Sequence, residues 1–213
     1  MPIYTKNGKR ILFVHIPKTG GSSIEKYLRS HDWEESRRFG HGIKNIHATW
    51  REYEKWGNFN YKFTVVRDPV ERFKSDLAHL TRDRKHAKEI RNFFAKPVKI
   101  QLNPHDNEPV KWAISDQNLR RFLAKVKKHP ECFDNHIRPQ VDFLNTNEEI
   151  DIFRYPNLSP EIKMALNFVL DVPLTGAKIA HLKNYPQEYK PTFTKSQEEI
   201  IKQYYKKDYK RFF

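Results

Sequence analysis

Residues 11–23 read ILFVHIPKTGGSS, a short apolar run that ends in a cluster of glycine and hydroxyl-bearing residues. The run from residue 11 to residue 16 is continuous rather than alternating, which is typical of a strand buried on both faces. After the glycines, Ile24, Tyr27 and Leu28 recur at the spacing of one helix face, so we expect a helix that starts near Ser22 or Ser23. The stretch predicts a strand, a glycine-bearing turn and a helix.

A second unit of the same kind follows. Residues 61–66, YKFTVV, form another β-branched and aromatic run, which ends at an Arg-Asp-Pro sequence. Beyond Pro69, apolar residues keep helical spacing up to Leu80, and a proline suits the first turn of a helix because its missing N–H would have had no partner there. Two strand–loop–helix units in succession predict an α/β fold with a central, mainly parallel sheet flanked by helices.

The rest of the chain carries weaker signals. We expect helices over 115–128 and 159–170, a strand over 150–155, and a closing helix over 196–207 that starts with a Ser-x-x-Glu capping box at Ser196 and Glu199. Residues 82–99 are densely basic, and residues 95–112 contain three prolines and are expected to form a loop. No repeat, low-complexity tract or second domain is apparent, so residues 1–213 are expected to be one domain.

Composition narrows the class of protein. The chain has 38% hydrophobic residues, enough for a packed core, and no apolar run of the roughly 18 residues that span a membrane. The N-terminus lacks the apolar region of a signal peptide, and Cys132 is the single cysteine, so a soluble protein of a reducing compartment is expected. The 40 Lys and Arg against 26 Asp and Glu give a net charge of +14, which suits a polyanionic partner: nucleic acid, a nucleotide, or a sulfated or uronate-rich glycan.

The turn after the first strand has the elements of an anion site. N–H groups at a helix start have no intrahelical partner, the helix dipole adds positive potential there, and glycines allow close approach of the main chain. Lys18 supplies a charge, and Thr19, Ser22 and Ser23 supply hydroxyl donors. The Walker pattern is absent because the lysine precedes the glycines, which disfavours a nucleoside triphosphatase.

Two segments resemble the sulfotransferases that use 3′-phosphoadenosine 5′-phosphosulfate (PAPS) as sulfuryl donor. HIPKTGGSS (15–23) is similar to their 5′-phosphosulfate loop, and FTVVRDPVERFKS (63–75) is similar to their 3′-phosphate site. The resemblance is closest to the carbohydrate branch that includes the heparan sulfate 2-O-sulfotransferases. It implies a single P-loop-like, three-layer sulfotransferase domain and transfer without a metal. It also implies these roles: Lys18 at the phosphate leaving group, Thr19, Gly20, Gly21, Ser22 and Ser23 at the 5′ end, and Arg67 and Ser75 at the 3′-phosphate.

A general base must accept the proton of the acceptor hydroxyl, and ten histidines compete for that role. The resemblance favours His47, which stands about twenty residues before the 3′-phosphate segment, as in the family. His41, between two glycines, is the alternative base. His15, inside the first expected strand, is expected to be a core or supporting residue.

The acceptor side is less defined. NHIRPQVDFL (135–144) resembles a family segment that lines the acceptor pocket, which makes His136, Arg138 and Gln140 candidates to hold the acceptor, although a structural corner at Pro139 is an equal alternative. The resemblance lapses over residues 82–130, where acceptor specificity could reside.

The function expected is sulfuryl transfer from PAPS to a hydroxyl, on a carbohydrate that could itself be anionic. The alternatives are a nucleotide or small-molecule kinase with a degenerate P-loop, which would need Mg²⁺, and a basic nucleic-acid-binding module. The expected setting is the cytoplasm of a microbe, or the Golgi lumen if the chain is a trimmed form. Lipid-linked sugars, nucleotide sugars, small metabolites and peptide tyrosines stay open as acceptors.

Overall fold

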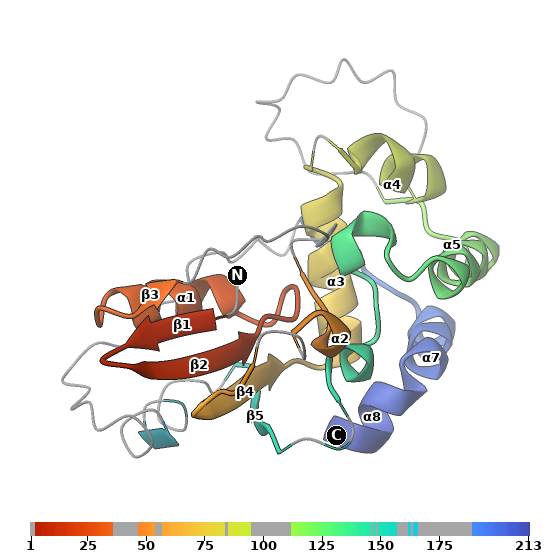
Figure 1. Ribbon diagram of the computed structural model, residues 1–213. Coiled ribbons are helices and arrows are strands. Elements are labelled where there is room, and N and C mark those ends of the chain that lie inside the picture. Colours follow the sequence, from red (N-terminus) through yellow and green to blue (C-terminus); the bar gives the residue numbers. More distant parts are fainter. Residues whose placement is uncertain are drawn as a thin grey trace. The chain divides into compact units, whose positions relative to one another are not determined.

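The computed structural model describes residues 3–35, 47–53, 57–83, 85–94, 112–145, 147, 149–156, 162, 164–165 and 189–213 (Figure 1). The chain divides into two compact units. The sheet unit comprises Met1–Arg67 and Pro139–Asn184, and the helical unit comprises Asp68–Arg138 and Tyr185–Phe213. The expectation of a single domain over residues 1–213 stays a prediction.

The sheet unit contains a five-stranded sheet in the order β3-β1-β2-β4-β5. The strands are β1 (Ile3–Lys6), β2 (Lys9–Val14), β3 (Glu34–Glu35), β4 (Tyr61–Val66) and β5 (Asp151–Arg154). β2, β4 and β5 pair in parallel, with Phe13 opposite Phe63 and Val65 opposite Phe153, whereas β1 pairs antiparallel with β2 and β3. The predicted α/β fold with a mainly parallel core and covering helices is confirmed.

Helix α1 (Gly21–Arg29) covers one face of this sheet (Figure 1). Its Ile24 and Leu28 share a buried cluster with Phe13 of β2 and Phe63 of β4. The short helix α2 (Trp50–Tyr53) and the 3₁₀ turn η3 (Gln140–Phe143) also belong to the sheet unit. Because α1 buries the odd-numbered residues of β2, Leu12 and the other even-numbered residues face away from it.

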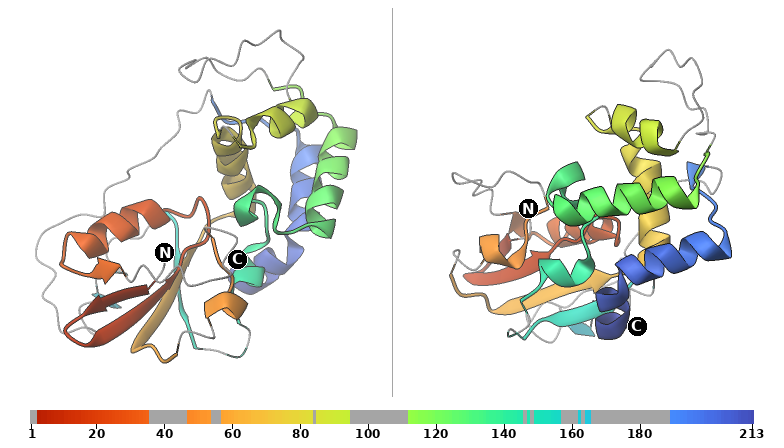
Figure 2. Two further views of the ribbon diagram at one scale, coloured as in Figure 1. Left: turned by 45° about the horizontal axis from the view of Figure 1, so that its top comes forward. Right: turned by 90° about the vertical axis from the view of Figure 1, so that its right-hand side faces the viewer.

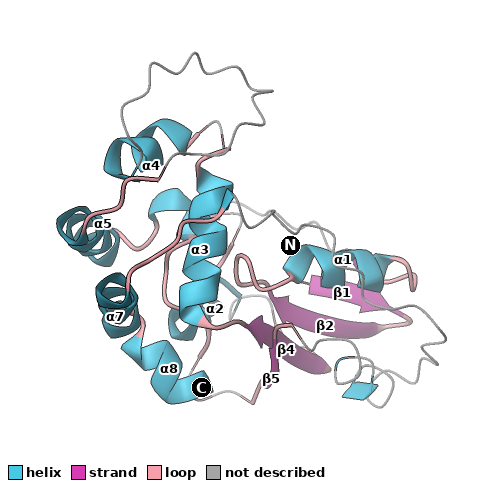
Figure 3. Ribbon diagram, turned by 180° about the vertical axis from the view of Figure 1, so that it is seen from behind, coloured by secondary structure: helices cyan, strands magenta, loops and turns pink. Residues whose placement is uncertain are grey.

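In the helical unit the described helices, seen in Figure 2, belong to one bundle of elements whose buried side chains form a cluster rich in aromatic residues. These helices are α3 (Pro69–Leu80), α4 (Ala87–Phe94), α5 (Asp116–Lys128), α7 (Lys195–Tyr204) and α8 (Lys206–Phe212), and the turn η2 spans Cys132–Asn135. Phe73, Phe122 and Tyr205 are fully buried among them. In Figure 3 the described strands all lie in the sheet unit, while the helical unit consists of helices and loops.

Most expected elements are present, with shifted ends. β4, α3, α5 and β5 lie where the sequence predicts them. The first strand ends at Val14 rather than residue 16, because the Ile16 N–H turns back to donate to the Val14 carbonyl at 3.1 Å. Helix α1 begins at Gly21 with Gly20 as its N-cap, so neither serine starts it.

Other expectations are wrong or lie outside the described residues. The capping box of α7 is formed by Thr194 and Gln197, not by Ser196 and Glu199. Strand β1, strand β3 and helix α4 were not expected. Of the helix predicted over 159–170, only residues 162, 164 and 165 are described, and all three are helical. Among the described helices, none is both long and apolar enough to cross a membrane.

Candidate active site

The loop between β2 and α1 is held by its own polar groups. The buried Thr19 hydroxyl donates to the Ile16 carbonyl at 2.9 Å. Lys18 (φ 62°) and Gly20 (φ 94°) both adopt left-handed backbone conformations, which are unusual for lysine and natural for glycine. The first turn of α1 contains no acidic residue. The loop therefore leads into a helix N-terminus whose charge favours an anion.

Gly21 is required by a neighbouring side chain. A Cβ built on Gly21 would lie 2.1 Å from His15 Nε2 and 2.2 Å from His15 Cδ2, far inside van der Waals contact. The two adjacent glycines are thus required for different reasons: Gly20 adopts the left-handed backbone conformation of the turn, and Gly21 leaves room for the His15 imidazole. The sequence indicated only close approach of a ligand to the main chain at both positions.

His15 links the loop to two other groups. Its Nδ1–H donates to Glu25 Oε1 of α1 at 2.7 Å, and its ring meets the ring of His47 edge to face with centroids 5.0 Å apart. Burial alone would raise the pKa of Glu25, but the hydrogen bond and charge of His15, together with the nearby charge of Arg29, hold that pKa below its usual value. His47 is partly buried and precedes α2. The predicted base therefore lies beside the histidine that packs against the first turn of α1.

Arg67 follows the end of β4 and reaches the same loop. Its Nη1 donates to the Lys18 carbonyl at 3.3 Å, and its guanidinium lies 4.7 Å from the centre of the Tyr155 ring. Gln140, fully buried, fixes the main chain of Arg67 from both sides: its Oε1 accepts from the Arg67 N–H at 3.0 Å, and its Nε2 donates to the Arg67 carbonyl at 2.9 Å. The two segments that were expected to bind the two ends of one anionic ligand meet in the sheet unit.

A comparison with protein families identifies the family of the chain. A family model described as "Sulfotransferase family" matches residues 1–213, which is the whole chain. The chain belongs to the sulfotransferase family. Comparisons with curated proteins and with solved structures found no match.

The sulfotransferase also contains a buried polar network in its helical unit. Arg72 and Asp76 of α3 are fully buried and lie 3.4 Å apart, and Arg72 donates to the carbonyls of His136 at 2.8 Å and Arg138 at 2.6 Å. His136 Nδ1 donates to Asp76 Oδ1 at 2.8 Å. The network fixes the segment that was expected to contact the acceptor.

The remaining predicted site residues have varied surroundings. Ser75 lies on α3 and is buried, and the His136 ring stacks on His79 with centroids 4.9 Å apart. The Arg138 Nε donates to the Pro130 carbonyl at 3.4 Å. Ser75, His136 and Arg138 belong to the helical unit and Gln140 to the sheet unit. Their roles toward a ligand stay predictions, and His41 lies outside the described residues.

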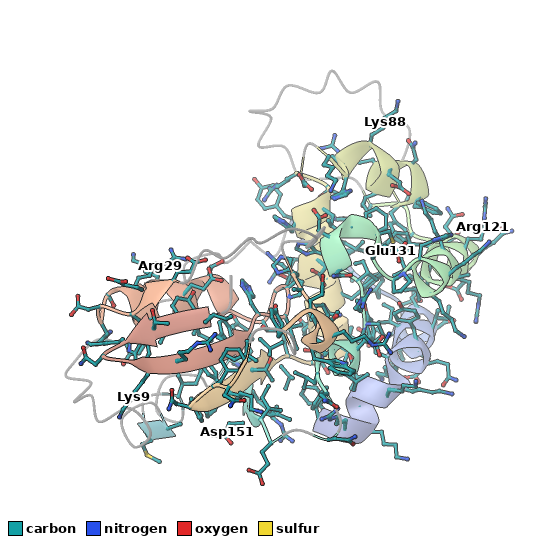
Figure 4. All side chains as sticks on the ribbon, viewed as in Figure 1. Lys9, Arg29, Lys88, Arg121, Glu131 and Asp151 are labelled. Atoms are coloured by element: carbon teal, nitrogen blue, oxygen red, sulfur yellow. The ribbon has the colours of Figure 1, made fainter. Side chains whose placement is uncertain are left out.

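The basic stretch of the sulfotransferase is only partly described. Arg120, Arg121, Lys127 and Lys128 of α5 are exposed, and Figure 4 shows Arg121 projecting from α5 and Lys88 from α4. Lys125 pairs with Glu89 of α4. Within the described residues, no group of three His, Cys, Asp or Glu side chains is arranged to hold a metal ion. The expectation of metal-independent transfer stays a prediction.

A pocket of about 280 Å³ lies in the sheet unit, on the face of β2 opposite α1. Leu12, Val14, Trp50, Tyr53 and Phe143 line it together with Lys62 and other residues. None of the predicted site residues lines this pocket.

Three contacts at the site have no sequence motif of their own: Glu25 with His15, the His15 ring with Gly21, and Gln140 with the Arg67 main chain. The available signal was Glu25 itself, the single acidic residue of α1, one turn after Gly21.

Proposed function

We propose that this sulfotransferase moves a sulfuryl group from PAPS to a hydroxyl of a carbohydrate, with His47 as general base. The observation that carries the proposal is the contact between the two anion-binding segments, in which Arg67 Nη1 lies 3.3 Å from the Lys18 carbonyl oxygen. A donor that bears a phosphosulfate at one end and a 3′-phosphate at the other needs two such segments at the carboxyl ends of neighbouring parallel strands.

The chemistry of these residues fits the donor. PAPS would supply an activated sulfuryl group whose leaving group is a phosphate. The first turn of α1 offers N–H groups and hydroxyls with no acidic residue among them, and Lys18 adds a cation. Arg67 can hold a phosphate bidentately, and Gln140 and Tyr155 restrict its freedom before a ligand arrives.

His47 supports the reaction through its position. It would accept the hydroxyl proton while the acceptor oxygen bonds to sulfur and the bond from sulfur to the phosphate oxygen breaks. Lys18 would balance the charge that builds up on the departing phosphate. His47 contacts His15, which in turn contacts the first turn of α1, so the proton acceptor and the anion loop are neighbours in one unit.

The positive charge of the protein is the basis for proposing an anionic acceptor. The net charge of +14 and the exposed basic side chains of α5 favour an anionic acceptor, for which a uronate-containing or sulfated carbohydrate is the best match. The family resemblance adds Ser75 at the 3′-phosphate and His136 and Arg138 at the acceptor.

The experiment is transfer of ³⁵S from labelled PAPS to a panel of uronate-containing, sulfated and neutral oligosaccharides and a tyrosine peptide, without Mg²⁺. We expect label on an anionic oligosaccharide. We also expect a loss of about 10²-fold or more in His47→Ala and Lys18→Ala. His129→Ala and Lys26→Ala, at exposed positions outside the proposed site, serve as matched controls. Label on the peptide alone would contradict the carbohydrate acceptor, and full activity in His47→Ala would contradict the base.

A further inference from the structure

Two histidine rings share one small volume beside the anion loop, and a carboxylate is bonded to one of them. The centroids of His15 and His47 are 5.0 Å apart, and Glu25 accepts a hydrogen bond from His15 Nδ1 at 2.7 Å. We propose that Glu25 directs the proton shared by this pair to His15, so that His47 keeps its neutral form. This role of Glu25 and His15 rests on the proposed function of His47 as base.

The pair cannot easily hold two protons. Two imidazolium ions in ring contact repel each other. Both side chains are partly buried, so water screens this repulsion less than it would at an exposed surface. Interacting groups of this kind titrate in two steps, and the first proton goes to the site with the better partner. The surroundings of each ring therefore decide which histidine is charged near neutral pH.

Glu25 makes His15 the histidine of the pair that binds a proton more readily. The carboxylate has only 15% of its side chain exposed, so an unpaired negative charge there would be costly, and a bond to a protonated His15 compensates it. The bond from Nδ1–H also fixes the ring orientation and places Nε2 against Gly21. Burial acts to raise the pKa of Glu25, yet this pKa is held below its usual value, and the hydrogen bond and charge of His15 contribute to that together with the charge of Arg29.

The other charged and titratable groups around the pair do not replace Glu25. Arg29 lies 3.4 Å from Glu25 Oε2 and 3.2 Å from Glu35, and its side chain is half exposed. Glu52 accepts hydrogen bonds from the N–H and the hydroxyl of Thr49. Burial raises the pKa of Tyr4 and of Tyr53, so both phenols are neutral.

The consequence for catalysis is that the two neighbouring histidines have different roles: His15 holds the proton, and His47 acts as the base. A base must be unprotonated when the acceptor hydroxyl arrives, and a lone histidine of ordinary pKa is partly protonated below neutral pH. With the proton held on His15, His47 stays available in this range. Pairs of titratable groups whose surroundings separate their pKa values are typical of acid–base sites. Glu25 and His15 would thus be positioning residues for His47.

The test is a pH titration of the histidine ring signals by NMR on the protein alone, with signals assigned from His15→Asn and His47→Asn. In the wild type we expect His15 to titrate at higher pH than His47. In Glu25→Gln we expect His15 to lose this preference, so that the difference between the two titrations shrinks or reverses. Glu35→Gln removes the same charge from the neighbourhood of Arg29 without removing the His15 bond, and it should leave the order unchanged.

A second arm separates this inference from the proposed function. If His47 is the base, the acid limb of the pH–rate profile with labelled PAPS should move to higher pH in Glu25→Gln and in His15→Asn, but not in Glu35→Gln. An unchanged His47 titration in both Glu25→Gln and His15→Asn would overturn the inference, whatever the activity. The expected titrations in a protein that neither binds nor uses PAPS would support the proton placement and contradict the proposed function instead.

Discussion

The imidazole of His15 occupies the space that a side chain at position 21 would need. A Cβ at position 21 would lie 2.1 Å from His15 Nε2, and the ring cannot swing away without losing its 2.7 Å bond to Glu25. The glycine is therefore a steric consequence of the Glu25–His15 pair. A motif that looks like a ligand cradle in the sequence is also a packing arrangement.

This contact predicts a compensating pair of substitutions. Gly21→Ala should lower the free energy of unfolding by about 1–3 kcal/mol, because the new methyl group overpacks against a fixed ring. The same change in a His15→Ala background should cost much less, since the ring is absent. Urea unfolding of the four proteins in this double-mutant cycle measures the coupling. Equal costs in both backgrounds would show that the ring does not restrict position 21.

Some candidate site residues were named by a local motif. Lys18 and Gly20 stand in a segment that has the elements of an anion site, and Arg67 stands in one that resembles the family's 3′-phosphate site; their binding roles stay predictions. Glu25 and Gln140 act through contacts with residues 10 and 73 positions away, and such contacts follow from the tertiary structure rather than from any local pattern. The family resemblance made Gln140 a candidate to hold the acceptor, and that role stays a prediction; its side-chain amide also bonds the Arg67 main chain, which no local pattern indicated.

Helix α7 begins one residue earlier than its sequence suggested. Thr194 Oγ1 accepts from the Gln197 N–H and the Gln197 side chain accepts from the Thr194 N–H, which forms a complete capping box. Thr194→Ala should cost about 1 kcal/mol of stability. Ser196→Ala, which removes only an exposed hydrogen bond to Asp116, is the matched control and should cost less than half of that. Thermal unfolding distinguishes them, and a larger cost for Ser196→Ala would contradict this assignment.

Helix α3 depends on a buried ion pair. Arg72→Met would leave Asp76 buried without its cation and would free two carbonyls, so we expect a loss of about 3–5 kcal/mol of stability. Lys74→Met, on the same helix, removes ion pairs to the partly exposed Glu71 and Glu198 and should cost about 1 kcal/mol or less. Denaturant unfolding measures both. Similar losses in the two variants would argue against a structural role for the network.

Elements were predictable in proportion to the strength of their apolar pattern. β2 and β4 are buried runs of β-branched and aromatic residues, and α3 and α5 have clear helical spacing. Strand β1 was missed because only four residues pair, although Asn7 (φ 48°) and Gly8 (φ 76°) form the left-handed turn that an Asn-Gly pair favours in a hairpin. Helix α4 was missed because basic residues obscure an apolar face formed by Ala87, Ile90 and Phe94.

The whole molecule should lose stability in acid in a way that involves Glu25. A carboxyl group whose pKa is lower in the folded protein than in the unfolded chain stabilises the fold at pH values above its unfolded pKa of about 4.3. This stabilisation is lost as the pH falls through the pKa of the folded protein. Glu25→Gln should therefore cost about 2 kcal/mol at pH 7 and progressively less as the pH falls through the lowered pKa of Glu25. Urea unfolding across this range is the measurement, and a cost independent of pH would contradict the coupling to His15.

The proposed donor site combines the loop between β2 and α1 with Arg67, and both would bind phosphate groups of one nucleotide. The direct measurement is calorimetric titration with 3′-phosphoadenosine 5′-phosphate in the absence of Mg²⁺, compared with ADP and ATP. We predict micromolar binding that prefers the 3′-phosphorylated nucleotide and weakens about tenfold or more in Arg67→Ala and Lys18→Ala. Absence of binding, or a preference for ATP with Mg²⁺, would contradict the proposed donor site.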